Sequence, residues 1–166
     1  VLAKRNLGTS MDMAPIVVGV GPGFTAGVDC HAVVETMRGH TLGRAYYEGS
    51  ALPNTAVPGL VGGFAGERVL RAPCDGGFRG VATIGDHVEE GQVVAYAGNA
   101  PVVATLTGVL RGLIADGVQV HQGLKCGDVD PRGQSGYCGL VSDKGLAVAG
   151  GVLEAILHLS GTFSAR

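Results

Sequence analysis

One segment of this sequence occurs twice, the second copy starting 32 residues after the first. The first copy spans residues 72–92 and the second spans residues 104–123. A solenoid needs several stacked repeats to bury a core, so a single duplication instead predicts two interlocked halves of one small β-domain. The residues that coincide at this offset are Ala72/Ala104, Gly76/Gly108, Arg79/Arg111, Gly80/Gly112, Gly85/Gly117, Val88/Val120 and Gly91/Gly123.

Glycines occur at equivalent positions in both copies. The strand-like runs between them are 78–84, 92–97 and 109–115. Because glycine reaches positive φ without steric cost, it marks positions where a short strand turns. We expect residues 67–130 to form one β-domain with an approximate two-fold axis, and Gly85 and Gly117 to lie in turns, with positive φ at one or both. The apolar faces expected to interlock are Phe78, Ile84, Val88 and Val94 against Leu110, Ile114, Val120 and Leu124.

The first copy also resembles a known domain. Ala-Pro-x-x-Gly at 72–76, followed by Ile-Gly-Asp-x-Val-x-x-Gly-Gln at 84–92, is similar to the barrel-sandwich domain of biotinyl and lipoyl carriers. In those carriers the modified lysine lies on the hairpin that joins the two halves. The corresponding residues here, 97–101, include no lysine. The resemblance therefore implies the fold without the carrier function, and a lipoyl- or biotinyl-like carrier module is kept as an alternative.

Composition excludes several classes of protein. With 46% hydrophobic and 16% charged residues, the chain can fill a core. A pI near 6.2 and the absence of tryptophan provide no surface for nucleic acid. No apolar run reaches the ~18 residues of a membrane span. The cysteines lack zinc-ligand spacing, so we expect no metal site and a reducing, cytoplasmic location; they are Cys30, Cys74, Cys126 and Cys138.

The segments around the β-domain predict strands first and a helix last. Residues 1–62 are expected to be strand-rich with a glycine-rich loop, and 131–166 to form a loop and a helix packed on that segment. The predicted fold class is mainly β with some α, the barrel-sandwich-like domain being inserted between the two. Ser142 and Asp143 are candidate N-caps of the helix. Its apolar residues at helical spacing are Leu146, Ala149, Leu153, Ile156 and Leu157.

Residues 28–36 contain the first candidate site. As a strand, which we favour, this segment places Asp29, His31 and Glu35 on one face; as a helix, His31 and Glu35 would be neighbours. Two carboxylates and an imidazole suit general acid/base catalysis or a pair of metal ligands. A solvent-exposed strand face would show the same alternation.

Two further segments predict anion binding. The loop with Gly21, Gly23, Thr25 and Gly27 follows an apolar run, Pro15–Val20, and glycine-rich turns expose amides that can cradle phosphate. It does not match G-x-G-x-x-G, and a tight loop between strands is the alternative. The polar segment at 4–6, formed by Lys4, Arg5 and Asn6, could hold an anionic group or be a solvated terminus.

Longer motifs resemble one family. They are residues 3–9, 13–24, 29–40, 125–132 and 142–144. Together they resemble the YqeB family, the accessory proteins of selenium-dependent molybdenum hydroxylase systems. The resemblance implies a longer polypeptide, with a nucleotide-binding-like α/β region before this segment, which would then be its C-terminal part. It supplies no catalytic residues.

The predicted function follows from this resemblance. We expect an accessory or maturation factor that binds a molybdopterin-type cofactor, a nucleotide or the apo-enzyme. Its expected partners are the hydroxylase or its cofactor-maturation proteins, without nucleic acid or membrane, and it could form a homo-oligomer. A small enzyme that uses His31 as base with Asp29 or Glu35 as its orienting group is the other alternative.

Overall fold

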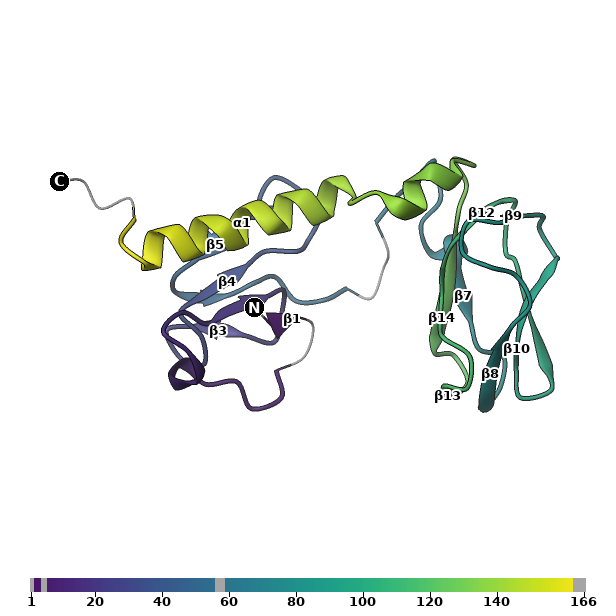
Figure 1. Cartoon of the computed structure of the whole chain (residues 1–166), viewed down its shortest axis with the longest axis horizontal. Helices are drawn as coiled ribbons and strands as arrows, with labels where there is room; N and C mark the ends of the chain where they lie inside the picture. Colours follow the sequence, from purple (N-terminus) through teal and green to yellow (C-terminus); the bar gives the residue numbers. More distant parts are fainter. Residues whose placement is uncertain (1, 4–5, 56–58, 163–166) are drawn as a thin grey trace. The chain divides into compact units, whose positions relative to one another are not determined.

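The computed structural model describes residues 2–3, 6–55 and 59–162 (Figure 1). The chain divides into two compact units. Residues 1–56 and 141–166 form an α/β unit, and residues 57–140 form a β unit. The mainly β fold with one C-terminal helix is confirmed for the described residues, in which no sheet closes into a barrel. No described helix combines the length and the apolar character needed to cross a membrane.

The β unit contains two four-stranded sheets with strand orders β11-β10-β8-β13 and β7-β14-β12-β9. Short 3₁₀ helices, η2 (Gly66–Arg68) and η3 (Ser135–Gly139), precede and follow them. The strands are β7 (Val69–Arg71), β8 (Gly76–Gly80), β9 (His87–Val88), β10 (Val93–Ala97), β11 (Ala100–Val103), β12 (Gly108–Leu113), β13 (Gln119–Val120) and β14 (Lys125–Asp130).

The sequence repeat maps one sheet onto the other. An offset of 32 residues carries β8 onto β12, β9 onto β13 and β10 onto β14, and relates β7 to β11. Hydrogen bonds repeat with the strands: the Gly85 amide donates to the Leu110 carbonyl and the Gly117 amide to the Phe78 carbonyl, both at 2.8 Å. The φ angles of Gly85 and Gly117 are 105° and 83°. The predicted turns with positive φ are therefore confirmed at both glycines.

The core of the β unit contains most of the apolar residues expected there. Buried side chains from both copies form one cluster that includes Phe78, Val88, Val94, Leu110 and Val120, with Ile114 and Leu124 packed at its margin. Ile84 was expected in this core, but it is 48% exposed. Ile84 lies in the turn between β8 and β9, outside the strands that enclose the core, and its equivalent in the second copy, Asp116, also lies in an exposed turn.

The α/β unit is built on a sheet of strand order β1-β2-β4-β5. β1 (Leu2–Ala3), β2 (Val18–Val20) and β4 (Ala32–Val34) are parallel, and β5 (Ala45–Tyr46) is antiparallel to β4. A separate pair joins β3 (Thr25–Ala26) to β6 (Gly49–Ser50), and η1 (Met11–Met13) precedes β2. The strand predicted over 28–36 is thus shorter, because residues 27–30 form a turn closed by the Gly27 amide on the Cys30 carbonyl at 2.9 Å.

Helix α1 (Asp143–Leu159) covers one face of this sheet. The Ser142 hydroxyl accepts a hydrogen bond from the Gly145 amide at 3.1 Å, so Ser142 is the N-cap. Val18, Ala32 and Val34 pack against Ala155. The approach of α1 is close at Gly151, where a Cβ atom would collide with the Gly43 carbonyl oxygen.

Along the chain, the β unit ends at residue 140 rather than at residue 130. We expected residues 131–166 to belong with the N-terminal segment, but 131–140 lie in the β unit. The Arg132 guanidinium forms hydrogen bonds of 2.9 and 2.6 Å with the Asp130 carboxylate, and the Cys138 thiol lies 3.9 Å from the Leu110 carbonyl oxygen. These contacts fasten the segment after β14 to its own unit.

Candidate functional site

The glycine-rich loop after β2 is a chain reversal. Gly21, Gly23 and Gly27 all have positive φ, at 85°, 97° and 82°. The Gly21 amide donates to the Val34 carbonyl at 2.9 Å, and the Gly27 amide closes the turn on Cys30. The Thr25 amide donates to a carboxylate at 2.8 Å. These three donors of the predicted phosphate cradle are therefore engaged within the chain.

Three predicted site residues come together in one polar network, which we call the Asp29 network. The two oxygens of the Asp29 carboxylate accept hydrogen bonds from the Asn6 side-chain amide at 2.7 Å and from the Thr25 amide at 2.8 Å. The Thr25 hydroxyl in turn lies 2.9 Å from the hydroxyl of Ser50. Lys4 and Arg5, predicted to assist Asn6, lie outside the described residues.

His31 and Glu35 have separate partners. His31 Nδ1 lies 3.1 Å from the Val17 amide nitrogen and accepts its hydrogen bond. The Glu35 side chain is fully buried, and its hydrogen-bond partners among the described residues are backbone amides. Its donors are Thr36 and Met37 at 2.7 Å each and Leu52 at 2.9 Å. The structure therefore joins Asp29 to Asn6 and Thr25, and gives Glu35 the role of fixing the segments that follow β4 and β6.

The cysteines are buried or hydrogen-bonded. Burial and the neighbouring Asp29 carboxylate raise the pKa of the Cys30 thiol to about 11, and burial raises the pKa of Cys126. The half-buried Cys74 thiol donates to the Ala97 carbonyl at 3.0 Å. A thiolate is the nucleophilic form of cysteine, so raised pKa values leave Cys30 and Cys126 protonated at neutral pH. Among the described residues, no three His, Cys, Asp or Glu side chains are grouped to hold a metal ion.

The hairpin between β10 and β11 was the expected position of a carrier lysine. Its turn consists of Gly98 and Asn99. Gly98 packs closely on the first copy, because a Cβ atom at Gly76 would lie 2.7 Å from the Gly98 Cα. The described turn offers no amine for attachment of a prosthetic group.

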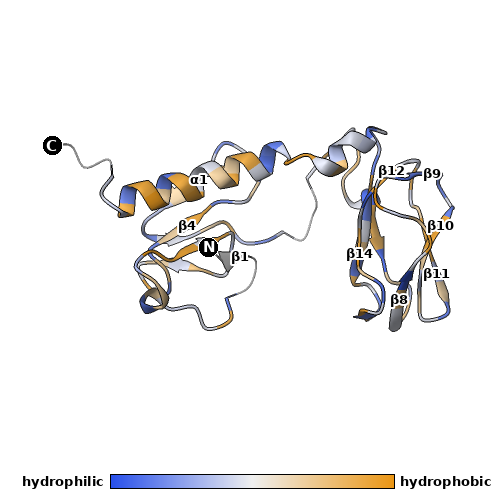
Figure 2. Cartoon of the chain, in the orientation of Figure 1, coloured by the Kyte–Doolittle hydropathy of each residue, from blue (hydrophilic) through white to orange (hydrophobic). Residues whose placement is uncertain are grey.

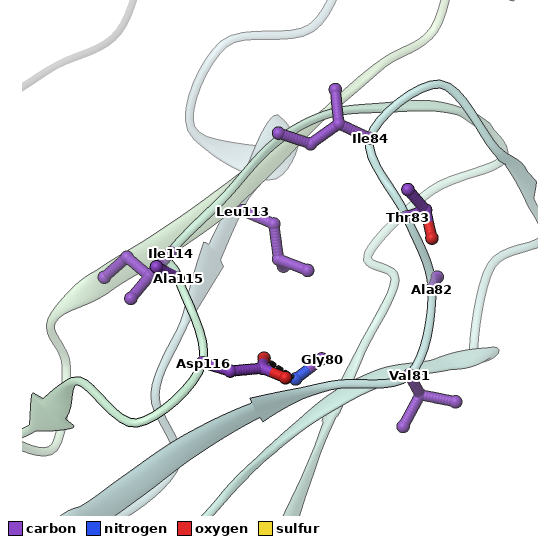
Figure 3. A pocket seen from close by; sticks show the side chains of 9 residues that line it. All are labelled: Gly80, Val81, Ala82, Thr83, Ile84, Leu113, Ile114, Ala115 and Asp116. Carbon is purple, nitrogen blue, oxygen red and sulfur yellow. Dashed lines mark hydrogen bonds between the residues drawn. The ribbon is translucent and has the colours of Figure 1, made fainter.

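An unpredicted pocket lies between equivalent loops of the β unit (Figure 3). It has a volume of about 310 Å³ and is lined by residues 80–84 and 113–116. Figure 3 shows Leu113 pointing into the space, and the Gly80 amide donating to Asp116 Oδ1, at 2.7 Å, along one side. The 32-residue offset makes the two loops equivalent. The repeat was therefore a sequence signal for a pocket between them, although no single residue indicated it.

The second hollow is apolar and lies along α1. It has a volume of about 530 Å³ and is lined by Val20 of β2 and by residues of α1 between 145 and 156. We call Leu146, Ala149, Leu153 and Ile156 the α1 outer face. Leu146 and Leu153 are 63% and 56% exposed. We expected these residues to pack on the N-terminal segment, but α1 uses Gly151, Val152 and Ala155 instead.

A buried ion-pair cluster ends β14. The Asp130 carboxylate is paired with Arg132 and lies 3.2 Å from the Arg111 guanidinium. Hydrogen bonding and the charges of these arginines lower the pKa of Asp130 to about 2, although burial opposes the shift. The Arg132 guanidinium also stacks on the Tyr137 ring at 4.7 Å. The arginines are thus held by the carboxylate and by the aromatic ring, in an arrangement that stabilises the fold.

The fold and these sites describe a mainly β protein with one covering helix. No family model matches the chain. It is 53% identical over 159 residues to "Uncharacterized protein YqeB" of Escherichia coli K12, and the match covers 96% of this chain and 29% of YqeB. The expected similarity to YqeB is thereby supported along nearly the whole chain, which spans less than a third of that relative.

Among solved structures, the chain resembles an aspartoacylase family protein from Mesorhizobium loti. The identity is 17%, the match covers 38% of this chain and 22% of that one, and the TM-score is 0.35. A likeness at this level carries no argument about fold or function.

Proposed function

We propose that this chain is a protein-binding part of an accessory factor for a selenium-dependent molybdenum hydroxylase, and that it docks on the cofactor-free enzyme. The family resemblance motivates the choice of partner, and the identity to YqeB supports that resemblance for the matched segment. The α1 outer face is the observation that carries the docking role.

Helix α1 is mainly apolar, and most of its visible ribbon is white to orange in Figure 2. Its inner side packs against the sheet. On the outer face, Leu146 is 63% exposed, Leu153 is 56% exposed and Ile156 is 37% exposed. A surface helix ordinarily carries polar residues on its solvent side, and contiguous exposed apolar side chains mark interaction surfaces. The hollow beside Val20 adds concave shape to this surface. An apolar segment of the hydroxylase polypeptide, exposed before cofactor insertion, has the complementary chemistry.

The polar sites support docking over cofactor binding or catalysis. Three of the loop amides predicted to bind a molybdopterin phosphate, those of Gly21, Thr25 and Gly27, donate within the chain. Glu35 is occupied by backbone amides. His31 Nδ1 is likewise occupied by the Val17 amide. These polar groups are therefore used to hold the fold, whereas the apolar residues of the α1 outer face remain exposed.

Binding of the 166-residue chain to the purified cofactor-free hydroxylase tests this proposal. Leu153→Glu places a charge in the centre of the α1 outer face and is expected to weaken binding at least about tenfold. Val28→Glu is the matched control, because Val28 is 72% exposed in the same unit but lies outside α1. Circular dichroism melting verifies that both variants fold.

Several outcomes would contradict the proposal. If Leu153→Glu binds the hydroxylase as tightly as the parent chain does, α1 is not part of the interface. Stronger binding to the cofactor-loaded enzyme would contradict a role before cofactor insertion. Concentration-dependent dimers lost with the same substitution would assign the outer face to a second copy. A lipoyl or biotinyl adduct in the intact mass would favour the carrier alternative instead.

A further inference from the structure

We propose that the pocket between the equivalent loops of the β unit binds an alkylammonium group, the chemistry carried by the end of a lysine side chain. The pocket belongs to residues 57–140, whereas the α1 outer face belongs to the other unit. The inference is therefore independent of docking through α1.

The pocket has the size and walls for a short aliphatic chain. Its volume of about 310 Å³ lies at the lower end of small-ligand sites. Figure 3 places Leu113 in the space, with Ala82 and Ile84 along the facing loop. Ile84 is 48% exposed, so an aliphatic stem laid against it would remove apolar surface from water.

Asp116 supplies a charge at one end of this space. Its Oδ1 atom accepts the Gly80 amide at 2.7 Å, which fixes the carboxylate in the pocket wall. Among the described residues Oδ2 has no hydrogen-bond partner. The repeat places Ile84 at the position equivalent to Asp116, so the two loops provide one charged end and one apolar end. A cation on an aliphatic stem matches both ends.

The charged residues of the two loops have a single sign. The loops 80–92 and 112–124 contain no lysine or arginine. Their carboxylates are Asp86, Glu89, Glu90 and Asp116. A surface region with charge of one sign attracts the opposite ion, and salt screens that attraction. The flanking arginines are engaged elsewhere, Arg79 over the Tyr96 ring and Arg111 against the Asp130 carboxylate. The carboxylates of the loops therefore favour a cation over a phosphate or carboxylate ligand.

An NMR titration of the ¹⁵N-labelled full chain with n-butylammonium tests the proposal. We expect saturable shifts at the amides of Gly80, Ala82 and Asp116, with a dissociation constant on the order of 1–10 mM that rises with salt. Neutral n-butanol, of similar shape, is expected to bind at least about fivefold more weakly. Equal binding of the alcohol, or no saturable shift by about 50 mM amine, would overturn the proposal.

Variants distinguish binding in the pocket from a general attraction of the amine to acidic side chains. Asp116→Asn keeps an oxygen for the Gly80 amide and is expected to weaken amine binding at least about fivefold. Glu90→Gln removes an exposed charge outside the pocket lining and should change the affinity less than about twofold. Ile84→Lys offers the pocket an amine from the chain itself, so it should block binding even if Asp116→Asn fails to fold. Unaltered binding in Asp116→Asn or Ile84→Lys contradicts the assignment.

The source of the ammonium group is distinguished by a second ligand. Blocked lysine, with both its α-amine and its carboxyl group as amides, carries the same butylammonium arm on a peptide backbone. Tighter binding than n-butylammonium indicates a lysine of a protein partner, and weaker binding indicates a free alkylamine.

Discussion

The α/β unit and the β unit achieve rigidity in different ways. In the α/β unit, key contacts occur once: Glu35 alone receives three backbone amides, and Gly151 alone admits the Gly43 carbonyl. In the β unit, the main contacts occur twice, as at Gly85 and Gly117. A substitution in the α/β unit therefore tests one contact, whereas the β unit offers the same contact at two equivalent positions that can be compared with each other.

The largest effect is expected from Gly151→Ala. The added methyl would collide with the Gly43 carbonyl oxygen and lie 2.9 Å from a Val34 methyl, so we expect destabilisation by about 3 kcal/mol. Gly150→Ala is the matched control, because a Cβ there meets nothing within 4 Å. It should stabilise α1 by about 0.5–1 kcal/mol. Urea unfolding measures the free energy of unfolding of both variants. Equal changes in the two would show that the close contact at Gly151 does not cause the destabilisation.

Glu35→Gln should come next. The amide retains one oxygen but presents an N–H₂ group to a backbone donor, and loss of hydrogen bonds to a buried charge is expected to cost about 3 kcal/mol. The exposed Glu48→Gln is the control and should be near neutral. Native-state hydrogen exchange should show faster opening at Thr36 and Leu52. If those amides exchange as in the parent protein, Glu35 does not hold them.

Gly117→Val and Gly85→Val test the duplicated contacts. Both glycines have positive φ and open space where a Cβ atom would lie, so the cost is backbone strain alone, about 1–3 kcal/mol each. Equivalent positions should give nearly equal losses in thermal unfolding. A large inequality would show that the two copies are not energetically equivalent despite their matching backbone.

Acid should weaken the β unit through Asp130, with the smallest effect. The folded-state pKa is lowered from 3.8 to about 2, so this carboxylate contributes stability that is present above pH 3.8 and is lost as the pH falls towards 2. The contribution is at most about 2.5 kcal/mol, and part of it remains at pH 2. Unfolding measured between these pH values should show the loss, and Asp130→Asn should flatten that part of the profile. A profile of the variant that matches the parent would exclude Asp130 as its origin.

Prediction from the sequence was more accurate at positions that occur in both copies of the repeat than at positions that occur once. Gly85 and Gly117 were predicted because each is supported by the other, whereas comparing Ile84 with Asp116 would have shown that Ile84 faces outward. Glu35 depends on the Leu52 amide, which no local pattern connects to it. The helical spacing of α1 was correct, but a helix that is apolar on both sides does not reveal which side meets the sheet.

The exchange of strands between sheets also sets the order of events during synthesis. Each sheet takes strands from both copies, and β7 at the start of the β unit finds its partner only in β14 at the end. The first half therefore leaves the ribosome with strand edges that nothing yet covers, and pairings between distant segments are slow to form. A nascent chain stalled before residue 125 would be open to proteases and chaperones, and the addition of β14 would join β7 to β12 and so complete the sheet β7-β14-β12-β9.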